Sequence, residues 1–105
     1  MPIVICKRVT FYSPNDETMF FEFLGRITAI RSFVGQEDGI HLSIHSVPSE
    51  ESLRDILALF HRYRIPAMRQ LAQFERKSNH DWFTDRNAYW HKKVFPSKID
   101  KHENS

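Results

Sequence analysis

The sequence is poor in the residues that build most recognisable sites. It has one cysteine, Cys6, and only three glycines among 105 residues. A single cysteine excludes a disulfide within the chain and leaves the zinc patterns of paired cysteines empty. The glycines Gly25, Gly35 and Gly39 match no phosphate-binding loop. We therefore expect no intramolecular disulfide, no metal site and no cofactor.

Long hydrophobic runs are missing as well. No apolar stretch approaches the roughly 20 residues that are needed to span a bilayer. The N-terminus does not show the order of basic, apolar and small residues that is typical of a signal peptide. The sequence predicts a protein without a membrane segment, and the lone cysteine favours the cytoplasm as its location.

Aromatic residues are the compositional excess, at 13% of the chain with nine Phe. Such rings carry a large apolar area into a core or an interface. The length and the apolar content predict one α+β domain over residues 1–95. Residues 96–105 contain one apolar side chain, Ile99, and are expected to form a flexible C-terminal tail.

Periodicity predicts the first two elements. A strand is expected over residues 3–13, because apolar residues recur there at period two. Its apolar face would carry Ile3, Ile5, Val9 and Phe11. Ser13 and Pro14 then provide helix-start chemistry, and the helix is expected to end near Gly25. Its apolar face would carry Met19, Phe20, Phe23, Leu24 and Ile27.

A β-hairpin and further helices are predicted next. Residues 28–34 and 40–44 read as its two strands, joined by a five-residue loop, 35–39. A helix begins near Ser49, and its apolar stripe would carry Leu53, Ile56, Leu57, Phe60 and Tyr63. Pro66 should start a new helix, and residues 79–95 are expected to form one or two short helices.

The order β-α-β-β followed by helices predicts an α+β fold in two layers. The simplest such arrangement is a three-stranded, mainly antiparallel sheet with the C-terminal helices packed on one face. The order of the strands in that sheet cannot be read from the sequence.

Charge is segregated along the chain. Residues 14–55 carry eight acids against three arginines, whereas residues 56–105 carry ten bases against five acids. If the acids converge, they would present a negative patch to a basic protein partner. The candidate partner-binding residues are Glu37, Asp38, Glu50, Glu51 and Asp55.

The basic and aromatic C-terminal segment suggests a second kind of partner. Basic side chains, Arg62 and Arg64 among them, could follow phosphates while aromatic rings stack on bases, as in the binding of single-stranded nucleic acid. The candidate nucleic-acid-binding residues are Arg69, Arg76, Lys77, Trp82, Arg86, Tyr89, Trp90, Lys92 and Lys93. The same rings could instead close the core.

The leading functional hypothesis is a non-enzymatic module that binds another protein, for instance a small immunity or antitoxin-type inhibitor that occludes its target. Nucleic-acid binding is the first alternative. A small phosphodiester hydrolase is the second, with His41 or His45 as the base and Arg31 or Lys7 as the stabilising cation. A homodimer, formed through the hairpin edge or the aromatic surface, is compatible with all three.

Overall fold

The chain alternates strands and helices at first and ends in short helical segments. The computed structural model describes residues 2–75 and 81–95, so the predicted tail, 96–105, lies outside the described residues. The elements in order are β1 (Ile3–Cys6), α1 (Pro14–Arg26), β2 (Ile30–Gln36), β3 (Gly39–Ile44), α2 (Glu50–Arg62), η1 (Pro66–Phe74), η2 (Asp81–Thr84) and α3 (His91–Val94).

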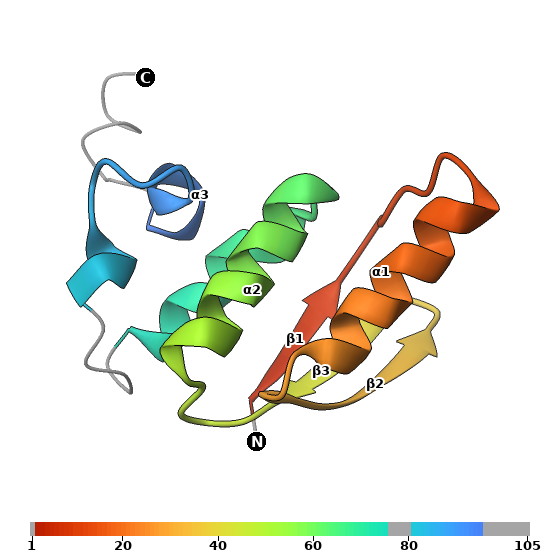
Figure 1. The fold of residues 1–105 in the computed structure, drawn as a ribbon, viewed down its shortest axis with the longest axis horizontal. Helices are drawn as coiled ribbons and strands as arrows, with labels where there is room; N and C mark the ends of the chain where they lie inside the picture. Colours follow the sequence, from red (N-terminus) through yellow and green to blue (C-terminus); the bar gives the residue numbers. More distant parts are fainter. Residues whose placement is uncertain (1, 76–80, 96–105) are drawn as a thin grey trace.

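The three strands form one antiparallel sheet in the order β1-β3-β2 (Figure 1). The last strand along the chain, β3, therefore lies in the middle, and it pairs with both of the others in an antiparallel sense. α1 and α2 cover one face of the sheet. This arrangement confirms the predicted α+β fold with a three-stranded antiparallel sheet.

The first strand is shorter than predicted, and its apolar face is the opposite one. β1 ends at Cys6 instead of residue 13, and Val4 and Cys6 are buried while Ile3 is exposed. The chain leaves the strand direction at Arg8, whose φ of 55° lies in the left-handed region. Val9 and Phe11 still pack against the core, but from the connection to α1 rather than from a strand.

The hairpin is confirmed, but its loop is shorter than the five residues expected. β2 and β3 are joined by a two-residue turn, Glu37-Asp38, with Gln36 paired to Gly39. Gly39 has a φ of 134°, and a β-carbon there would collide with the backbone carbonyl of Cys6. This position needs glycine because β1 passes directly beside the start of β3.

A β-bulge in β2 shifts its register against β3 between Ile30 and Ser32. Because of the extra residue, Ile30 and Phe33 are both opposite buried residues of β3, Ile44 and Leu42. The ring of Phe33 stacks on Phe21 of α1, with ring centroids 5.6 Å apart. β2 thus contacts the helical layer through residues that a strict period of two would place on opposite faces.

Both long helices begin where the sequence predicts. The Ser13 hydroxyl accepts a hydrogen bond from the Asp16 amide at the start of α1, and Ser49 accepts one from Ser52 at the start of α2. Four residues of the predicted stripe of α2 are buried, together with Leu59, which was not predicted, whereas Tyr63 caps the helix and is only half-buried. In α1, Phe20 and Leu24 are buried, whereas Met19 is 56% exposed.

The C-terminal segments close the core beside α2 and β1. η1 begins at Pro66 as predicted, but it is a 3-10 helix, and its Gln70 side chain bonds to the backbone of β1. The indole N–H of Trp90 donates a hydrogen bond to the Phe83 carbonyl over 2.8 Å, which joins η2 to the start of α3. None of the helices described in residues 2–75 and 81–95 is long and apolar enough to cross a membrane.

Candidate functional site

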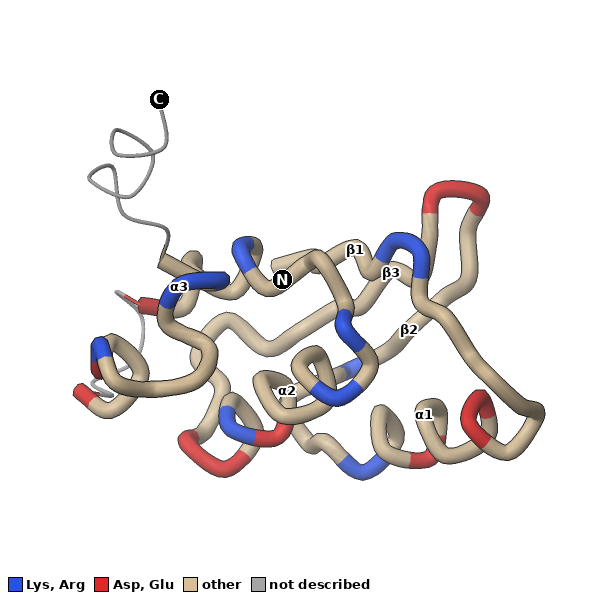
Figure 2. Tube along the Cα trace, turned by 90° about the horizontal axis from the view of Figure 1, so that it is seen from above, with Lys and Arg blue, Asp and Glu red and all other residues tan. Residues whose placement is uncertain are grey.

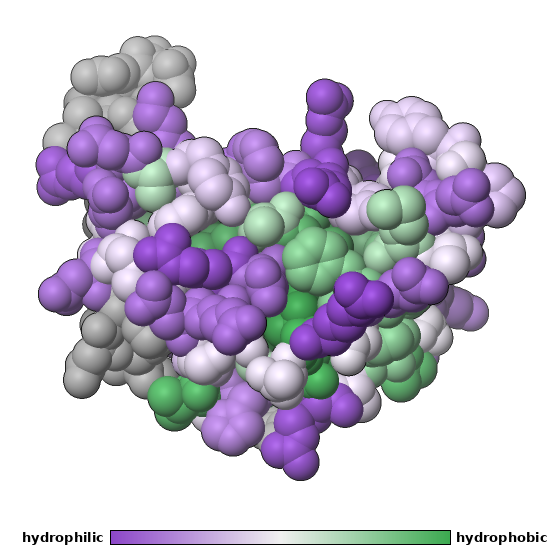
Figure 3. Space-filling view, viewed as in Figure 1, coloured by the Kyte–Doolittle hydropathy of each residue, from purple (hydrophilic) through white to green (hydrophobic). Residues whose placement is uncertain are grey.

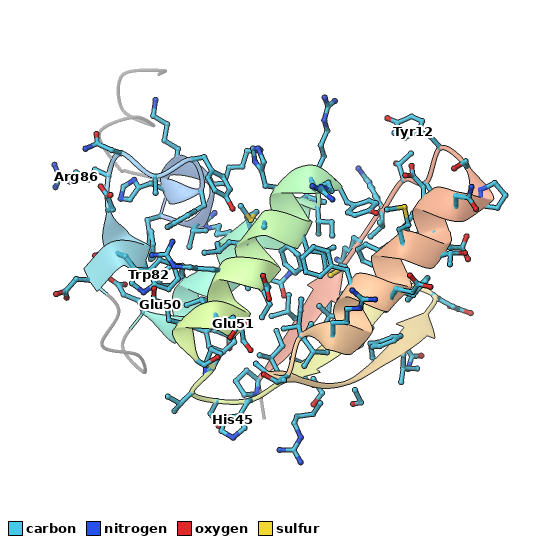
Figure 4. The ribbon with its side chains drawn as sticks, in the orientation of Figure 1. Tyr12, His45, Glu50, Glu51, Trp82 and Arg86 are labelled. Atoms are coloured by element: carbon cyan, nitrogen blue, oxygen red, sulfur yellow. The ribbon has the colours of Figure 1, made fainter. Side chains whose placement is uncertain are left out.

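A pocket of about 550 Å³ opens where the start of α1, the end of α2 and the chain after β1 meet. We call it the basic pocket. The start of α1 and the end of α2 lie at the upper end of the molecule in Figure 1, and Figure 4 labels Tyr12 near the start of α1. Its lining residues are Arg8, Thr10, Tyr12, Asp16, Met19, Arg62, Tyr63 and Arg64.

Positive charge dominates this pocket, which has three arginines and one acid in its lining. The acid, Asp16, is engaged locally, because its carboxylate accepts a hydrogen bond from the Tyr12 amide over 3.0 Å. Arg8, Arg62 and Arg64 are all exposed, and no described side chain forms an ion pair with any of them. The pocket can therefore offer three guanidinium groups to an anion.

The wall of the basic pocket is held in place by aromatic packing. Tyr63 follows the last residue of α2, and its ring lies edge-on to Phe20 and to Phe11, with centroids 5.0 and 6.3 Å away. Its hydroxyl donates to the Asp16 carbonyl over 3.4 Å, which links α2 to the first turn of α1. The pocket is thus built on the core rather than on a free loop.

Arg64 stands in a backbone position where glycine is the usual residue. It follows the C-terminal cap of α2 with a φ of 53°. The Arg64 amide bonds to the His61 carbonyl, and the Ile65 amide bonds to the Phe60 carbonyl. These two bonds define a Schellman motif with Arg64 at its left-handed position. An arginine there costs about 1 kcal/mol or more in backbone energy.

Arg8 has the same left-handed conformation, with a φ of 55°. Arg8 and Arg64 are the only residues other than glycine with a positive φ in the described part of the chain. Both line the basic pocket, although 56 positions of sequence separate them. Strained residues of this kind concentrate at binding and catalytic sites.

A second hollow, of about 480 Å³, adjoins the basic pocket and shares Arg64 with it. His61 and Lys93 also line it, together with apolar residues of η1. The ring of Tyr89 lies 4.5 Å from that of His61. Basic groups therefore continue from the basic pocket toward α3, and Figure 2 shows Lys and Arg after β1, at the end of α2 and on α3.

An apolar hollow of about 310 Å³ lies between α1 and α2 and shares Met19 with the basic pocket. Phe23 forms its apolar wall, while Glu22, Arg26 and Asp55 surround it. Figure 3 shows this seam as a hydrophobic band between hydrophilic side chains. Its charges are mixed in sign, so it favours no ligand of one charge.

The aromatic residues predicted to stack on bases differ in their exposure. Trp90 is only 7% exposed and packs in the core, so little of its ring is left for a ligand to contact. Trp82 lies edge-on to Trp90, and the Arg54 guanidinium covers its ring at 4.1 Å. Tyr89 is 48% exposed, and burial of its remaining part raises the pKa of its phenol despite the opposing charge of Arg54.

The predicted basic residues that the structure describes come from three parts of the C-terminal region. Arg69 lies on η1, Arg86 follows η2, and Lys92 and Lys93 lie on α3. In Figure 4, Trp82 and Arg86 lie at the opposite end of the molecule from Tyr12. Two further predicted residues, Arg76 and Lys77, lie outside the described residues.

The five predicted acids are divided between two places as well. Glu37 and Asp38 form the hairpin turn, where they line a shallow hollow with Lys7 and Arg8. Glu50, Glu51 and Asp55 lie on the first turns of α2, at the other end of the molecule (Figures 2 and 4). Glu50 also pairs with Arg54 over 2.9 Å. The five residues therefore do not make one negative patch.

One of the two predicted catalytic histidines has an acid beside it. The His41 Nε2 and Asp38 Oδ1 atoms are 2.6 Å apart, and this hydrogen bond lowers the pKa of Asp38. Lys7 lies near enough for its charge to lower that pKa further. His45 instead accepts a hydrogen bond from the Val47 amide at its Nδ1 atom. Of the two histidines predicted as alternative bases, only His41 thus has an acidic partner among the described residues.

Metal-ligand chemistry has no geometric support in the described ranges, where no three His, Cys, Asp or Glu side chains gather around one point. Comparison of the chain with protein-family models, curated proteins and solved structures finds no match to any of them. Function is therefore inferred from the geometry of the site alone.

Sequence reasoning found part of the basic pocket. Arg62 and Arg64 belong to the predicted basic segment, but Arg8, Tyr12 and Asp16 were not assigned to any site. A signal for Arg64 was present, because the helix before Pro66 has no glycine or asparagine at its end. Nothing in the sequence brings Arg8 to the same place, since β1 reaches the end of α2 only through the fold.

Proposed function

We propose that the protein binds single-stranded nucleic acid through the basic pocket and the hollow beside it. The observation that carries this proposal is the pair Arg8 and Arg64. Both are held in left-handed backbone conformations that cost stability, and both line the same pocket. Glycine would relieve the backbone at either position, but it would remove a guanidinium group from the pocket.

The chemistry of this surface fits a phosphate-bearing ligand. Arginine binds phosphate with two parallel hydrogen bonds, and the basic pocket has three arginines. Its volume of about 550 Å³ lies in the range of pockets that hold a nucleotide-sized ligand. Lys93 and His61 extend the basic surface beyond Arg64, so a chain of phosphates fits better than a single one.

Exposed tyrosines flank this surface and favour a single strand over a duplex. Tyr12, 85% exposed, lies in the lining of the basic pocket, and Tyr89 lies beside His61 at the second hollow. Aromatic rings bind nucleic acid by stacking on unpaired bases, whose faces are covered in a duplex. The proposal thus keeps the predicted type of ligand but changes the binding residues. Of the candidate nucleic-acid-binding residues predicted from the sequence, it retains Tyr89 and Lys93.

The test compares Arg64→Gly, Arg8→Gly and the double variant with the wild type. Fluorescence anisotropy would measure binding of labelled single-stranded RNA and DNA oligonucleotides across a salt series. Each variant should weaken binding by about tenfold, since one charge-assisted contact to phosphate is lost. Each should also lower the salt slope of the logarithm of affinity by about 0.7. The two oligonucleotides distinguish RNA from DNA as the ligand.

Stability separates a binding role from a structural one. Glycine at position 64 should raise the free energy of unfolding by about 0.5–1 kcal/mol, because the left-handed strain disappears. Arg86→Ala is the matched control, since it removes an exposed arginine at the other end of the molecule. Absence of binding at low salt, or equal affinity of the wild type and the double glycine variant, would overturn the proposal.

Hydrolysis of a phosphodiester is a second candidate, favoured by the His41–Asp38 pair. Asp38 can orient His41 as a base, and Lys7 and Arg8 beside it can hold a phosphate. Arg8 also lines the basic pocket, so a strand bound there can reach His41. Incubation with end-labelled RNA would reveal cleavage, which His41→Asn should abolish while binding persists. If the RNA stays intact after prolonged incubation, hydrolysis is excluded and binding remains as the proposed function.

Inhibition of a protein target, as by an immunity or antitoxin-type protein, stays a proposal with less geometric support. Its candidate acids are divided between the hairpin turn and the start of α2. If a protein partner contacts the hairpin turn, Glu37→Lys should weaken its binding and Glu51→Lys should not. If it contacts the start of α2, the reverse should hold. Affinity purification from the native source, with Arg69→Glu as a surface control, would test this alternative.

A further inference from the structure

The outer edge of β2 is the least covered part of the sheet. In the strand order β1-β3-β2, it is one of two edges. Six of its seven residues are exposed, among them Phe33 at 37% and Val34 at 52%. The strand has no proline and one charged residue, Arg31. Such an edge offers unpaired backbone groups to another strand.

The other edge of the sheet is closed by a side chain. The Gln70 amide accepts a hydrogen bond from the Ile5 N–H and donates one to the Ile5 carbonyl, each over 3.0 Å. It thus makes the two bonds that a neighbouring strand would make to β1. No described side chain bonds to the backbone of β2 in this way. The two edges therefore differ, and among the residues that the structure describes none covers the edge of β2 as Gln70 covers that of β1.

The turn determines which residues of β2 face outward. Gln36 and Gly39 flank the two-residue turn and pair with each other. Backbone groups in an antiparallel ladder point alternately toward the paired strand and away from it. We therefore expect Phe33 and Gly35 to direct their N–H and C=O groups away from β3.

We propose that two copies of the chain pair through β2, antiparallel and centred on Val34. In this register the outward groups of Phe33 in one copy meet those of Gly35 in the other. The Phe33 ring would then lie across Gly35, where the space around an added β-carbon is open to 4 Å. A ring over a glycine on a neighbouring strand is a favourable cross-strand arrangement.

Charge supports the same register. A centre at Val34 places Arg31 of each copy opposite Glu37 of the other, so the dimer gains two pairs of opposite charge. Arg31 and Glu37 are both exposed in one chain, and neither has an ion-pair partner among the described residues. The bulge at Arg31 removes it from the ladder with β3. Within the described ranges, no acid therefore pairs with this arginine.

The pairing is self-complementary and ends at two copies. Each copy contributes the same edge, so the two-fold arrangement is closed. A third copy would need the outer edge of β1, which Gln70 occupies. The inference predicts a dimer with one continuous six-stranded sheet.

A charge-reversal cycle tests the partner and the register together. Sedimentation equilibrium would measure the dimer dissociation constant of the wild type, Arg31→Glu, Glu37→Arg and the double variant. Each single reversal creates two like-charge pairs and should raise the dissociation constant by about tenfold. The double variant restores opposite charges and should return to within about threefold of the wild type.

Arg69→Glu makes the same charge change on η1 and should leave the dissociation constant unchanged. Circular dichroism would show that each variant is folded. A wild type that stays monomeric up to near-millimolar concentration would overturn the proposed dimer. A dimer that neither reversal weakens, or that the double variant fails to restore, would overturn pairing centred on Val34.

Discussion

At the scale of single residues, Ser52 joins two parts of the fold. It is the only polar side chain among the buried residues described, and its hydroxyl contacts Thr28 Oγ1 at 3.0 Å and the Ala29 amide at 3.2 Å. It thereby ties α2 to the connection between α1 and β2. A buried N–H that loses its acceptor costs more than the hydrogen bond is worth in the folded state.

We expect Ser52→Ala to lower the free energy of unfolding by about 1–3 kcal/mol, because the Ala29 amide is left without its acceptor. Thr28→Ala removes the neighbouring hydroxyl but keeps that acceptor, so its loss should be smaller. Urea denaturation of both variants would measure the difference. Equal losses would show that the Ala29 amide finds another partner.

Cys6 gives a prediction for alkaline pH. Burial raises the pKa of its thiol from 9.0 to about 12. Between these values the unfolded chain loses the proton and the folded chain keeps it, so the stability of the fold falls as pH rises through this window. The fall is about 1.4 kcal/mol per pH unit at most.

Cys6→Ala isolates this contribution from the other groups that titrate at high pH. The difference in unfolding free energy between the wild type and the variant should shrink as pH rises above 9.0. Denaturant unfolding at several pH values would measure it. A difference that stays constant to high pH would mean that the thiol ionises equally in both states.

Arg8 and Arg64 show what a sequence hides at this scale. Their residue type was visible, but their left-handed backbone was not, because arginine rarely adopts it. The conformation of Arg64 follows from the end of α2, and that of Arg8 from the bend after β1. The strained backbone of Arg8 and Arg64, which marks the basic pocket, is therefore visible only in the structure.

At the scale of elements, η2 and α3 depend on one indole. Trp90 stands directly before α3, and its N–H reaches back to the Phe83 carbonyl in η2. Its ring lies edge-on to those of Trp82 and Tyr89, with centroids 5.6 and 4.8 Å away. The predicted short helices with poor periodicity are thus ordered by aromatic packing rather than by an amphipathic pattern.

Trp90→Phe keeps an aromatic ring but removes the N–H donor. We expect it to lower the free energy of unfolding by about 1–3 kcal/mol, since the Phe83 carbonyl loses a buried partner. Tyr89→Phe, at the exposed neighbouring position, should change stability by less than about 0.5 kcal/mol. Thermal or urea unfolding would compare the two. Similar losses in both variants would argue that the hydrogen bond contributes little.

Elements that are determined by residues close together in the sequence were predicted best. Both capped helices and the hairpin were predicted well, because Ser13, Ser49 and the glycine-flanked turn act within a few residues. β1 was predicted too long and with the wrong face. Alternation continues past Cys6, and Arg8 ends the strand without any residue that is typical of a break.

At the scale of the whole molecule, the basic pocket, the hairpin turn and the open edge of β2 come from different parts of the chain. Part of the acidic segment has basic neighbours in the fold. Lys7 and Arg8, which directly follow β1, lie beside the acids of the hairpin turn, and Glu50 pairs with Arg54. The meeting of the end of α2 with the chain after β1 brings three arginines into one pocket.

The closed edge of β1 predicts how the molecule behaves at high concentration. Gln70→Leu removes both bonds to Ile5 and should lower the free energy of unfolding by about 1 kcal/mol. It should also create larger assemblies, because a second strand edge becomes available. Gln73→Leu adds the same apolar group to η1 without uncovering β1. Light scattering would compare the two, and equally small particles in both would contradict the protective role of Gln70.

The central position of β3 also constrains the order in which the sheet can form. β1 is synthesised first, yet its only strand partner, β3, ends at Ile44. During translation the N-terminal strand must therefore wait until some forty further residues have been added. The hairpin of β2 and β3 is local in the sequence and can close without β1, so we expect the first strand of the chain to be the last to join the sheet.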